Sequence, residues 1–281
     1  MQLVDLHVHS NFSDGACTPT EVLRLAKEAD LSAVALTDHN TIDGLDEFLL
    51  ESEKLNIEAV AGVEISSEYN GVELHVVALC LDNSVYSKVR DFLAIQAKRK
   101  EENNELLARR LCENGYKVDY EKIKKEAQGT INRVHFAKEL IKNGYISSVG
   151  EGFSTILSEK DGLYVPPKRL STFEVIEFIK SINCVSVLAH PLLSFSSREE
   201  LLEFLPKAKE LGLNAIEVRY SKYSLEDQEF CTEVAKKFDL LMSGGSDFHG
   251  QNKPDISIGK GLGNLQVPYE FLQKLKEKKG K

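Results

Sequence analysis

Six of the seven histidines lie in short motifs, and five of these six, all except His190, stand within two residues of a carboxylate or of a second imidazole. His7 and His9 share the motif Asp5-Leu-His-Val-His, and their separation of two residues places both side chains on one face of a strand. The other motifs are Thr37-Asp-His-Asn, Glu73-Leu-His-Val-Val, Ala189-His-Pro and Ser246-Asp-Phe-His. Imidazole and carboxylate donors together bind divalent metals of borderline hardness. The pattern predicts a hydrolase that holds several metal ions.

Each of these residues, taken alone, has an ordinary structural interpretation. A single His75 within a strand is more often a hydrogen-bonded core residue, His190 before a proline can simply end a strand, and Asp14 before a glycine is a common turn residue. The pair formed by His7 and His9 is different, since two imidazoles on one strand face rarely serve packing. Taken together, the motifs favour metal binding.

These candidate ligands need a framework that brings distant segments together, and the apolar runs predict one. Strands are expected at 3–8, 31–36, 58–65, 72–81, 184–189, 215–218 and 240–243. Helices are expected from Thr18 onward, over 41–55, and near 171–182, 197–211 and 224–238. Strands that alternate with helices indicate βα units around a parallel sheet or barrel.

The candidate ligands follow the ends of the expected strands. In a βα barrel the carboxyl ends of the strands meet at one mouth, where active sites are built. His75 lies inside the fourth strand, and Asp5 shares the strand face of His7, where it is expected to orient a ligand. The residues at or just beyond strand ends are Asp14, His39, Glu64, His190, Asp247 and His249.

The middle of the chain breaks this alternation. Between about Ser84 and Lys168 the pattern predicts amphipathic helices near 85–114, 119–127, 133–143 and 147–158, without a buried strand. We therefore expect a barrel made of 1–84 and 169–281, with a helical subdomain inserted at 85–168. The basic clusters of the insertion are interleaved with glutamate, which is typical of solvated helix faces.

Composition limits the partners and the compartment. The net charge of −9 argues against a broad surface for nucleic acid such as duplex DNA, although it is compatible with a local pocket for one phosphate group. No run approaches the roughly 20 apolar residues that span a bilayer, so no membrane partner is expected. The five cysteines are scattered without a CxxC pair, which favours a reducing cytoplasm. The sequence leaves the oligomeric state open.

The motifs resemble those of a known family. Asp5-Leu-His-Val-His-Ser, Leu36-Thr-Asp-His-Asn, Gly62-Val-Glu-Ile-Ser, Leu188-Ala-His-Pro and Gly245-Ser-Asp-Phe-His are similar, in this order and over nearly the whole chain, to the PHP (polymerase and histidinol phosphatase) domain. The chain resembles in particular the stand-alone PHP phosphoesterases that hydrolyse nucleoside 3′,5′-bisphosphates and shorten small RNAs from the 5′ end. The resemblance implies an α/β fold, a distorted seven-stranded (β/α) barrel with a helical insertion between the fourth and fifth strands.

The resemblance also implies a cluster of two or three divalent metal ions. Manganese is the usual ion of such proteins, and iron and zinc suit the same mixture of imidazole and carboxylate donors. The implied ligands are His7, His9, Glu64 and Asp247 for one ion, Glu64, His75 and His190 for a second, and Asp14, His39 and His249 for a third.

The seventh histidine lies in the insertion, in Asn132-Arg-Val-His-Phe-Ala-Lys, which resembles an Arg-x-His-Phe-Ala element of these phosphoesterases. By this resemblance Arg133 would bind phosphate with its planar fork, and His135 would donate to an oxygen or protonate the leaving group. Tyr164 and Lys168, at the exit of the insertion, are further candidates for substrate contact. Relatives often carry a histidine at the position of Tyr223, whose side chain is not a cation at neutral pH.

The expected reaction is hydrolysis of a phosphate ester, in which a hydroxide that bridges the ions attacks phosphorus. The expected substrates are small and phosphorylated, a nucleotide or a short RNA. A histidinol-phosphate phosphatase shares the metal motifs and is the first alternative. A carbon–nitrogen amidohydrolase also begins with an HxH pair, but Glu64 takes the position of its bridging lysine. A catalytically silent PHP module is disfavoured, because no ligand position is lost.

Overall fold

The structure, a computed structural model, describes residues 2–126, 131, 133–166 and 168–279. The chain forms two compact units, Met1–Leu93 with Leu170–Lys281, and Ala94–Arg169. The first unit contains the seven-stranded sheet, and the described part of the second unit consists of helices and their connections. Among the described residues, none of the helices combines the length and the apolar character that a membrane crossing requires.

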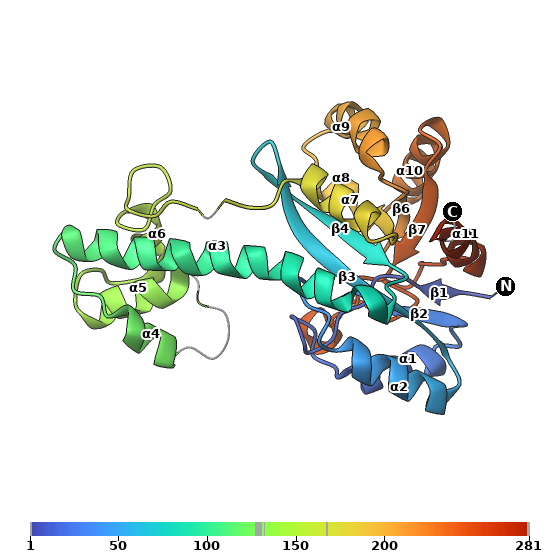
Figure 1. Cartoon of the computed structure of the whole chain (residues 1–281), viewed down its shortest axis with the longest axis horizontal. Coiled ribbons are helices and arrows are strands. Elements are labelled where there is room, and N and C mark those ends of the chain that lie inside the picture. Colours follow the sequence, from blue (N-terminus) through green and yellow to red (C-terminus); the bar gives the residue numbers. More distant parts are fainter. Residues whose placement is uncertain (1, 127–130, 132, 167, 280–281) are drawn as a thin grey trace. The chain divides into compact units, whose positions relative to one another are not determined.

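The seven strands of the first unit follow one another in the sheet in the order of the sequence (Figure 1). Beyond the first strand, the Leu6 N–H donates to the Gly244 carbonyl at 3.2 Å, and the Asp247 N–H donates to the His7 carbonyl at 2.8 Å. These bonds join the two edges, so the sheet is a nearly closed barrel and the expected distorted seven-stranded barrel is confirmed. The strands are β1 (Val4–Asp5), β2 (Ala33–Leu36), β3 (Glu58–Tyr69), β4 (Val72–Leu79), β5 (Val185–Leu188), β6 (Ala215–Tyr220) and β7 (Leu241–Gly245).

One strand departs from the expected parallel arrangement. β4 pairs antiparallel with both β3 and β5, whereas the other neighbouring strands pair in parallel. The reversal occurs at Asn70 and Gly71, whose positive φ angles of 51° and 80° are those of a type I′ hairpin turn. Because β4 is reversed, His75 in its first half pairs with Ser66 of β3, and its carbonyl accepts the Ala189 N–H after β5. His75 therefore reaches the end of the barrel where the parallel strands finish.

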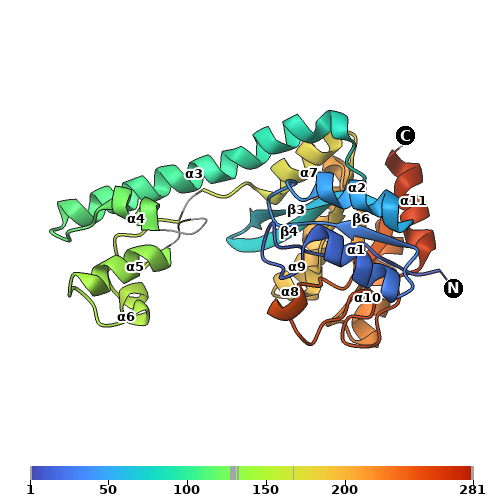
Figure 2. The same ribbon diagram turned by 90° about the horizontal axis from the view of Figure 1, so that it is seen from below.

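Helices cover the outside of the barrel. α1 and α2 pack beside β2 and β3, α7 beside β3, β4 and β5, and α10 beside β6 and β7 (Figures 1 and 2). α1 starts as predicted, because Thr18 and Glu21 cap each other's backbone N–H groups. α2 begins later than the expected residue 41. The helices are α1 (Pro19–Glu28), α2 (Leu45–Leu55), α7 (Thr172–Ser181), α8 (Pro191–Ser194), α9 (Arg198–Leu211), α10 (Leu225–Lys237) and α11 (Tyr269–Lys279), with short 3₁₀ turns η1 (Asn83–Val85) and η2 (Gly250–Asn252).

Two apolar cores lie on the two sides of the barrel wall. The larger core fills the space between the strands and the covering helices. The smaller core fills the inside with short side chains such as Ala33 and Val185, together with Leu272 and Leu275 of α11. Ala33 and Val185 begin their strands, so the inner core occupies the amino end of the barrel. Polar side chains are therefore concentrated at the carboxyl end.

The second unit is built on the later part of a long helix, α3. Leu107 of α3 and Phe136 belong to its own apolar core, around which the shorter helices gather (Figure 2). The start of α3 belongs to the barrel instead, because Tyr86, Val89 and Leu93 are part of the larger core there. The insertion was expected at 85–168, whereas the compact unit is Ala94–Arg169 and therefore begins later in α3. The helices are α3 (Tyr86–Glu113), α4 (Tyr120–Glu126), α5 (Arg133–Lys142) and α6 (Val149–Ser154).

Asp5 is a buried carboxylate that ties the closing edge of the barrel together. Its Oδ1 accepts the Ser246 N–H at 2.8 Å, and its Oδ2 accepts the Gly259 N–H at 2.7 Å. The sequence suggested that Asp5 orients the neighbouring ligand directly. Asp5 Oδ1 also accepts the His7 backbone N–H at 3.4 Å, so the carboxylate fixes the backbone of that ligand together with the exit of β7 immediately before Asp247.

Replacement of Asp5 by Asn is expected to lower the free energy of unfolding by about 1.5–3 kcal/mol, the range for hydrogen bonds to charged groups. The new amide NH₂ would face the Gly259 N–H, where an acceptor is needed. Asp30→Asn is the matched control, because Asp30 is exposed and its φ of 58° is tolerated by asparagine. Urea unfolding measures both changes. Equal stability of Asp5→Asn and the wild type would contradict the role given to Asp5.

Candidate metal centre

All nine predicted ligands lie in the first unit, and their side chains meet at the carboxyl end of the barrel. They come from segments that are far apart in the sequence, and β6 is the one strand of the described sheet that neither contains a candidate ligand nor is closely followed by one. They are His7 and His9 after β1, Asp14 in the loop before α1, His39 after β2, Glu64 in β3, His75 in β4, His190 after β5, and Asp247 and His249 after β7.

The fully buried carboxylate of Glu64 stands at the centre of the cluster, and each of its oxygens faces a different set of imidazoles. Oε1 lies 3.0 Å from His75 Nδ1 and 3.1 Å from His190 Nε2. Oε2 lies 3.1 Å from His7 Nε2, 3.2 Å from His9 Nε2 and 3.1 Å from His39 Nδ1. Five imidazoles therefore share one carboxylate, and a carboxylate with ligands on both oxygens can bridge two ions.

Several of these close atoms do not form hydrogen bonds with one another. Glu64 Oε2, His7 Nε2, His9 Nε2 and His39 Nδ1 are buried and have no hydrogen-bond partner. Buried polar atoms without partners cost free energy, and native proteins leave few of them. A cation among these atoms would satisfy them together, and imidazole nitrogen with carboxylate oxygen is a donor set that divalent transition metals accept. The residues present therefore fit metal ions.

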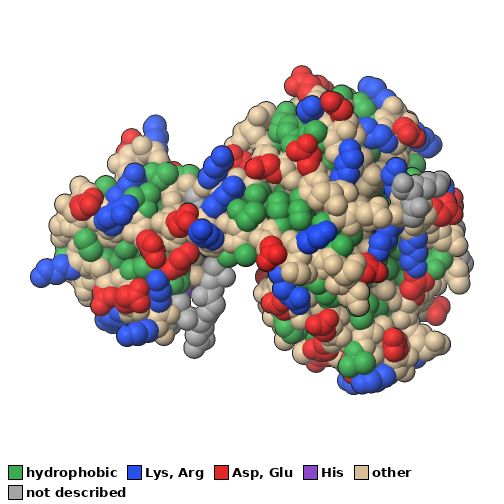
Figure 3. All heavy atoms as spheres, in the orientation of Figure 1, with side chains coloured by type: hydrophobic (Ala, Val, Ile, Leu, Met, Phe, Trp, Pro, Cys, Tyr) green, Lys and Arg blue, Asp and Glu red, His purple; other side chains and the backbone are tan. Residues whose placement is uncertain are grey.

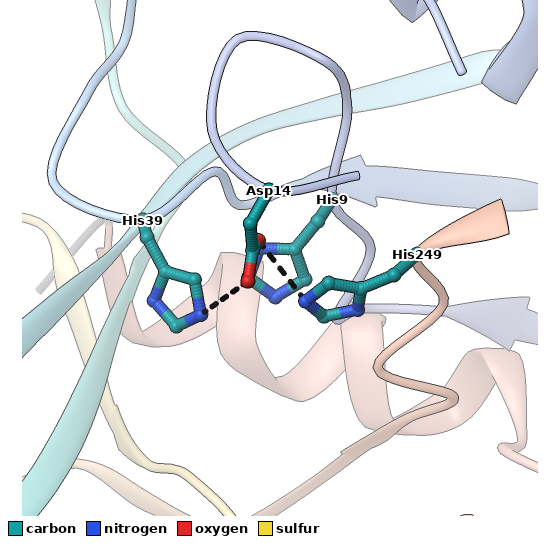
Figure 4. Close-up of side chains that lie close together, drawn as sticks. All are labelled: His9, Asp14, His39 and His249. Carbon is teal, nitrogen blue, oxygen red and sulfur yellow. Dashed lines mark ion pairs between the residues drawn. The ribbon is translucent and has the colours of Figure 1, made fainter. Parts of the chain in front are cut away.

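A second group of donors surrounds Asp14. One ligand atom from each of His9, Asp14, His39 and His249 lies within 4.8 Å of the others. Figure 4 shows the Asp14 carboxylate between the rings of His39 and His249, with Oδ1 3.1 Å from His249 Nε2 and Oδ2 3.9 Å from His39 Nε2. The Asp14 side chain is 57% exposed, whereas His9 and His249 are buried, so Asp14 lies on the solvent side of this group.

Asp247 completes a third group with the HxH pair. Its Oδ1 lies 3.3 Å from His9 Nε2 and 3.9 Å from His7 Nε2. The residue has a positive φ of 56°, a conformation that is uncommon outside glycine and that persists at sites where the surroundings enforce it. The groups overlap, since His9 belongs to two of them and Glu64 also groups with His39 and His75.

The electrostatics of the cluster separate the imidazoles into two kinds. Burial lowers the pKa of His75, but the charges and hydrogen bonds of Glu64 and Glu73 together outweigh burial and raise this pKa to about 9. Burial dominates at His39 and lowers its pKa to about 4. Burial alone would raise the pKa of Glu64, yet the neighbouring imidazoles, led by His7, hold it well below its usual value. At neutral pH the metal-free cluster therefore contains an ionised carboxylate, a protonated His75 and a neutral His39.

Asp38 positions the loop that carries Asp14, a role that the sequence did not indicate. Its Oδ1 accepts the Ser10 N–H at 2.7 Å and the Ser13 hydroxyl at 2.6 Å, while its Oδ2 accepts the Ser10 hydroxyl at 2.6 Å. These three bonds fix the turn between β1 and α1. The sequence contained one indication of a role for Asp38, namely that it directly precedes His39 in Thr37-Asp-His-Asn.

Three further side chains contact the candidate ligands and were missed in the sequence. Glu217 lies 2.8 Å from His7 Nδ1, while Tyr220 and Lys253 each donate to Asp247 Oδ2 at 2.8 Å. A charged residue between apolar neighbours in the expected strand 215–218 was the one signal for Glu217, because isolated charges are rarely buried. Tyr220 and Lys253 lay outside the recognised motifs.

The substrate candidates of the insertion lie in the second unit. Arg133 begins α5, and its guanidinium packs over the rings of Phe153 and Tyr164 at 4.5 and 4.4 Å. It also pairs with Glu159 at 3.1 Å. The structure thus brings together Arg133 and Tyr164. His135 is half-buried on the same helix.

Lys168 and Tyr223, which the sequence also singled out, lie in different surroundings. Lys168 is exposed, and its carbonyl accepts from Arg99 at 3.5 Å. Tyr223 is buried, and its hydroxyl accepts the Leu192 N–H at 3.0 Å. Tyr223 therefore anchors α8 behind His190 rather than offering its hydroxyl to a substrate.

Comparison with known proteins identifies the family. The sequence matches the PHP domain over residues 5–158. It is 30% identical over 245 residues to a 5′-3′ exoribonuclease from Haemophilus influenzae, which covers 87% of this chain and 89% of that protein. It is 28% identical to a 3′,5′-nucleoside bisphosphate phosphatase from Chromobacterium violaceum, covering 92% of this chain and 91% of that protein.

Among solved structures, a protein from Bifidobacterium adolescentis assigned as a metal-dependent phosphoesterase is similar with a TM-score of 0.70. The two sequences are 28% identical, and the match covers 99% of this chain and 96% of that one. The family match, the full-length relatives and the shared barrel agree with the cluster at its carboxyl end. The chain belongs to the PHP domain family.

Proposed function

We propose that this chain is a metal-dependent phosphoesterase of small phosphorylated substrates: a nucleoside 3′,5′-bisphosphate, a short RNA degraded from its 5′ end, or both. The observation that carries this proposal is the sharing of Glu64 by five imidazoles. Such a site can hold cations side by side, and adjacent cations stabilise the attacking and leaving oxygens of phosphoryl transfer. The activities after which the Haemophilus and Chromobacterium relatives are named support the substrate class.

Charge and composition support a small substrate in the cytoplasm. The net charge is −9, and on the face drawn in Figure 3 the Lys and Arg side chains are interspersed with Asp and Glu. A mixed surface of this kind favours a local phosphate site over a duplex DNA surface. Five scattered cysteines suit a reducing compartment.

In this proposal Glu64 and the surrounding imidazoles would hold manganese ions, with iron and zinc as alternatives that suit the same donors. The separate positions of the two Glu64 oxygens support two ions, and the group around Asp14 supports a third. The ligands would be His7, His9, Glu64 and Asp247 for the first ion, Glu64, His75 and His190 for the second, and Asp14, His39 and His249 for the third.

Bound divalent ions would lower the pKa of a water molecule and neutralise phosphate oxygens. The chain's own residues decide where the substrate meets them. The side chains of Asp14, His39 and His75 are 57%, 24% and 20% exposed, whereas those of His7 and His9 are fully buried. The phosphate therefore approaches the cluster from the side of Asp14, His39 and His75.

The insertion at 85–168 is proposed to supply phosphate contacts. Arg133 has a cationic fork that is only partly buried, and its partner Glu159 is exposed, so a phosphate can replace that carboxylate. Tyr164 stacks on the guanidinium and limits its orientations. His135 would protonate the leaving oxygen, and Lys168 would add a positive charge for longer substrates.

A substrate screen tests the proposed function. Protein supplied with Mn²⁺ is incubated with adenosine 3′,5′-bisphosphate, 5′-phosphorylated short RNA, cyclic phosphates and histidinol phosphate, and the products are measured. The highest kcat/KM is expected on the first or second substrate, with Glu64→Gln as the inactive control. A preference for histidinol phosphate would replace this proposal by the phosphatase alternative, and turnover of none of them would reject it.

Metal binding is expected to release protons. His75, with a pKa of about 9 in the metal-free protein, is protonated at pH 7.5 and must lose its proton to become a ligand. Apparent affinity for Mn²⁺ should therefore fall as the pH falls below 9, by about tenfold per pH unit for each proton displaced. Titration of Mn²⁺ into weakly buffered metal-free protein at pH 7.5 measures the release. A His75→Asn variant should release fewer protons, and equal release by both proteins would remove His75 from the site.

Arg133→Ala is expected to lower kcat/KM by about 10- to 100-fold, the equivalent of one charge-assisted hydrogen bond. The loss should appear mainly in KM, since Arg133 captures the substrate. Arg109→Ala, an exposed arginine on α3, is the control. Steady-state kinetics on the best substrate of the screen distinguish the two variants. An unchanged kcat/KM for Arg133→Ala would disprove the phosphate contact.

A further inference from the structure

β6 supplies none of the nine candidate ligands, yet its side chains contact ligands that come from three other parts of the barrel. We propose that β6 is the orienting strand of the metal centre, in which Glu217 and Tyr220 are positioning residues for His7, His190 and Asp247. This inference rests on the proposed metal centre.

Glu217 connects two of these ligands through its two oxygens. Its side chain is almost fully buried, Oε1 lies 2.8 Å from His7 Nδ1, and Oε2 accepts the His190 backbone N–H at 2.7 Å. A carboxylate accepts hydrogen bonds, so this contact places a proton on His7 Nδ1. The other nitrogen, Nε2, then keeps its lone pair toward Glu64 Oε2, 3.1 Å away, where a metal would be held.

The contact of Glu217 with His190 is made to the backbone N–H of His190 and not to its imidazole ring. His190 has φ 27° and ψ 51°, a strained conformation for a residue other than glycine. The Glu217 bond holds the N–H of this residue, and the resulting direction of the side chain brings Nε2 to 3.1 Å from Glu64 Oε1. Glu217 therefore acts on ligands at both oxygens of Glu64.

A β-bulge explains how one short strand presents two such residues. Positions 217 and 220 are three apart, and in a regular strand they would point to opposite faces. The pairing of β6 with β7 shifts between Glu217, opposite Ser243, and Arg219, opposite Gly244, so Val218 is an extra residue. Val218 packs in the outer core, and Arg219 contacts Thr232 of α10. Tyr220, which also belongs to the larger core, follows this extra residue, and its hydroxyl reaches Asp247 at the carboxyl end of the barrel.

Tyr220 uses this orientation to hold Asp247. Its hydroxyl donates to Asp247 Oδ2 at 2.8 Å, and Lys253 donates to the same oxygen at 2.8 Å. Oδ1 is thereby left for the HxH pair, 3.3 Å from His9 Nε2. With both donors on one oxygen, Asp247 presents a single defined oxygen to an ion.

Glu217→Gln tests the proposal with little change in volume. The glutamine oxygen would accept the His190 N–H, and its NH₂ would face His7 Nδ1, which must then accept and transfer the ring proton to Nε2. Affinity for Mn²⁺, measured by the EPR signal of the free ion, should fall by about 10- to 100-fold. Glu229→Gln, an exposed glutamate on α10, should bind as the wild type does. Tyr220→Phe should weaken binding less, because Lys253 remains on Asp247.

The nitrogen of His7 that carries the ring proton can be measured directly. A residue that only stabilised the fold would not determine this position. In wild-type protein loaded with Zn²⁺ as a diamagnetic probe, ¹⁵N NMR should show His7 protonated at Nδ1, and this requires no variant to fold. A proton on Nε2, or wild-type Mn²⁺ affinity in folded Glu217→Gln, would overturn the proposal. Both readouts use metal alone, so a wild-type protein that binds Mn²⁺ but hydrolyses no phosphate ester would reject the proposed function and leave this inference standing.

Discussion

The burial of the Glu64 carboxylate is the constraint on which the carboxyl end of the barrel depends. A buried charge costs several kcal/mol unless other groups compensate it. Here the compensation comes from five imidazoles on two sides, but several of their nitrogens lie close to the carboxylate without forming hydrogen bonds. Such a cluster is poorly satisfied by itself and well suited to cations. The same feature that would be unfavourable in an ordinary core thus gives the site its affinity for metal.

The barrel can carry this cluster because its two ends are built differently. Small apolar side chains and α11 fill the amino end. The close approach of β7 to the chain after β1 depends on Gly245, where a Cβ would lie 2.5 Å from the His7 amide nitrogen. Asp5 then fixes the exit of β7 from the inside. Backbone packing and one buried carboxylate therefore hold the ligand-bearing segments in place, including His190 and Asp247 with their positive φ angles.

The sequence predicted the parts of this structure that depend on local pattern. His7 and His9 were identified as candidate ligands by their residue type and by their separation of two residues. The start of α1 was identified by its capping residues. The alternation of strands and helices indicated a parallel sheet and did not predict the reversal of β4, although the pair Asn70-Gly71 between β3 and β4 is typical of hairpin turns. The family resemblance added the seven-stranded barrel and the grouping of ligands, neither of which follows from spacing alone.

Other features were not predictable because they arise from pairing between distant segments. The roles of Glu217 and Tyr220 depend on the bulge in β6, which is defined by register with β7. The division of α3 between two units depends on which core receives Tyr86, Val89 and Leu93. Asp38 acts through a loop of serines whose path the sequence does not specify.

The most direct test of the account is anomalous diffraction from crystals grown with Mn²⁺. The arrangement of imidazoles around Glu64 predicts one strong peak next to Glu64 Oε1, near His75 and His190, and another next to Oε2, near His7, His9 and Asp247. Crystals of the Glu64→Ala variant should lack both of these peaks. Peaks confined to surface carboxylates, or none within coordination distance of Glu64, would contradict the claim that this carboxylate organises a metal centre.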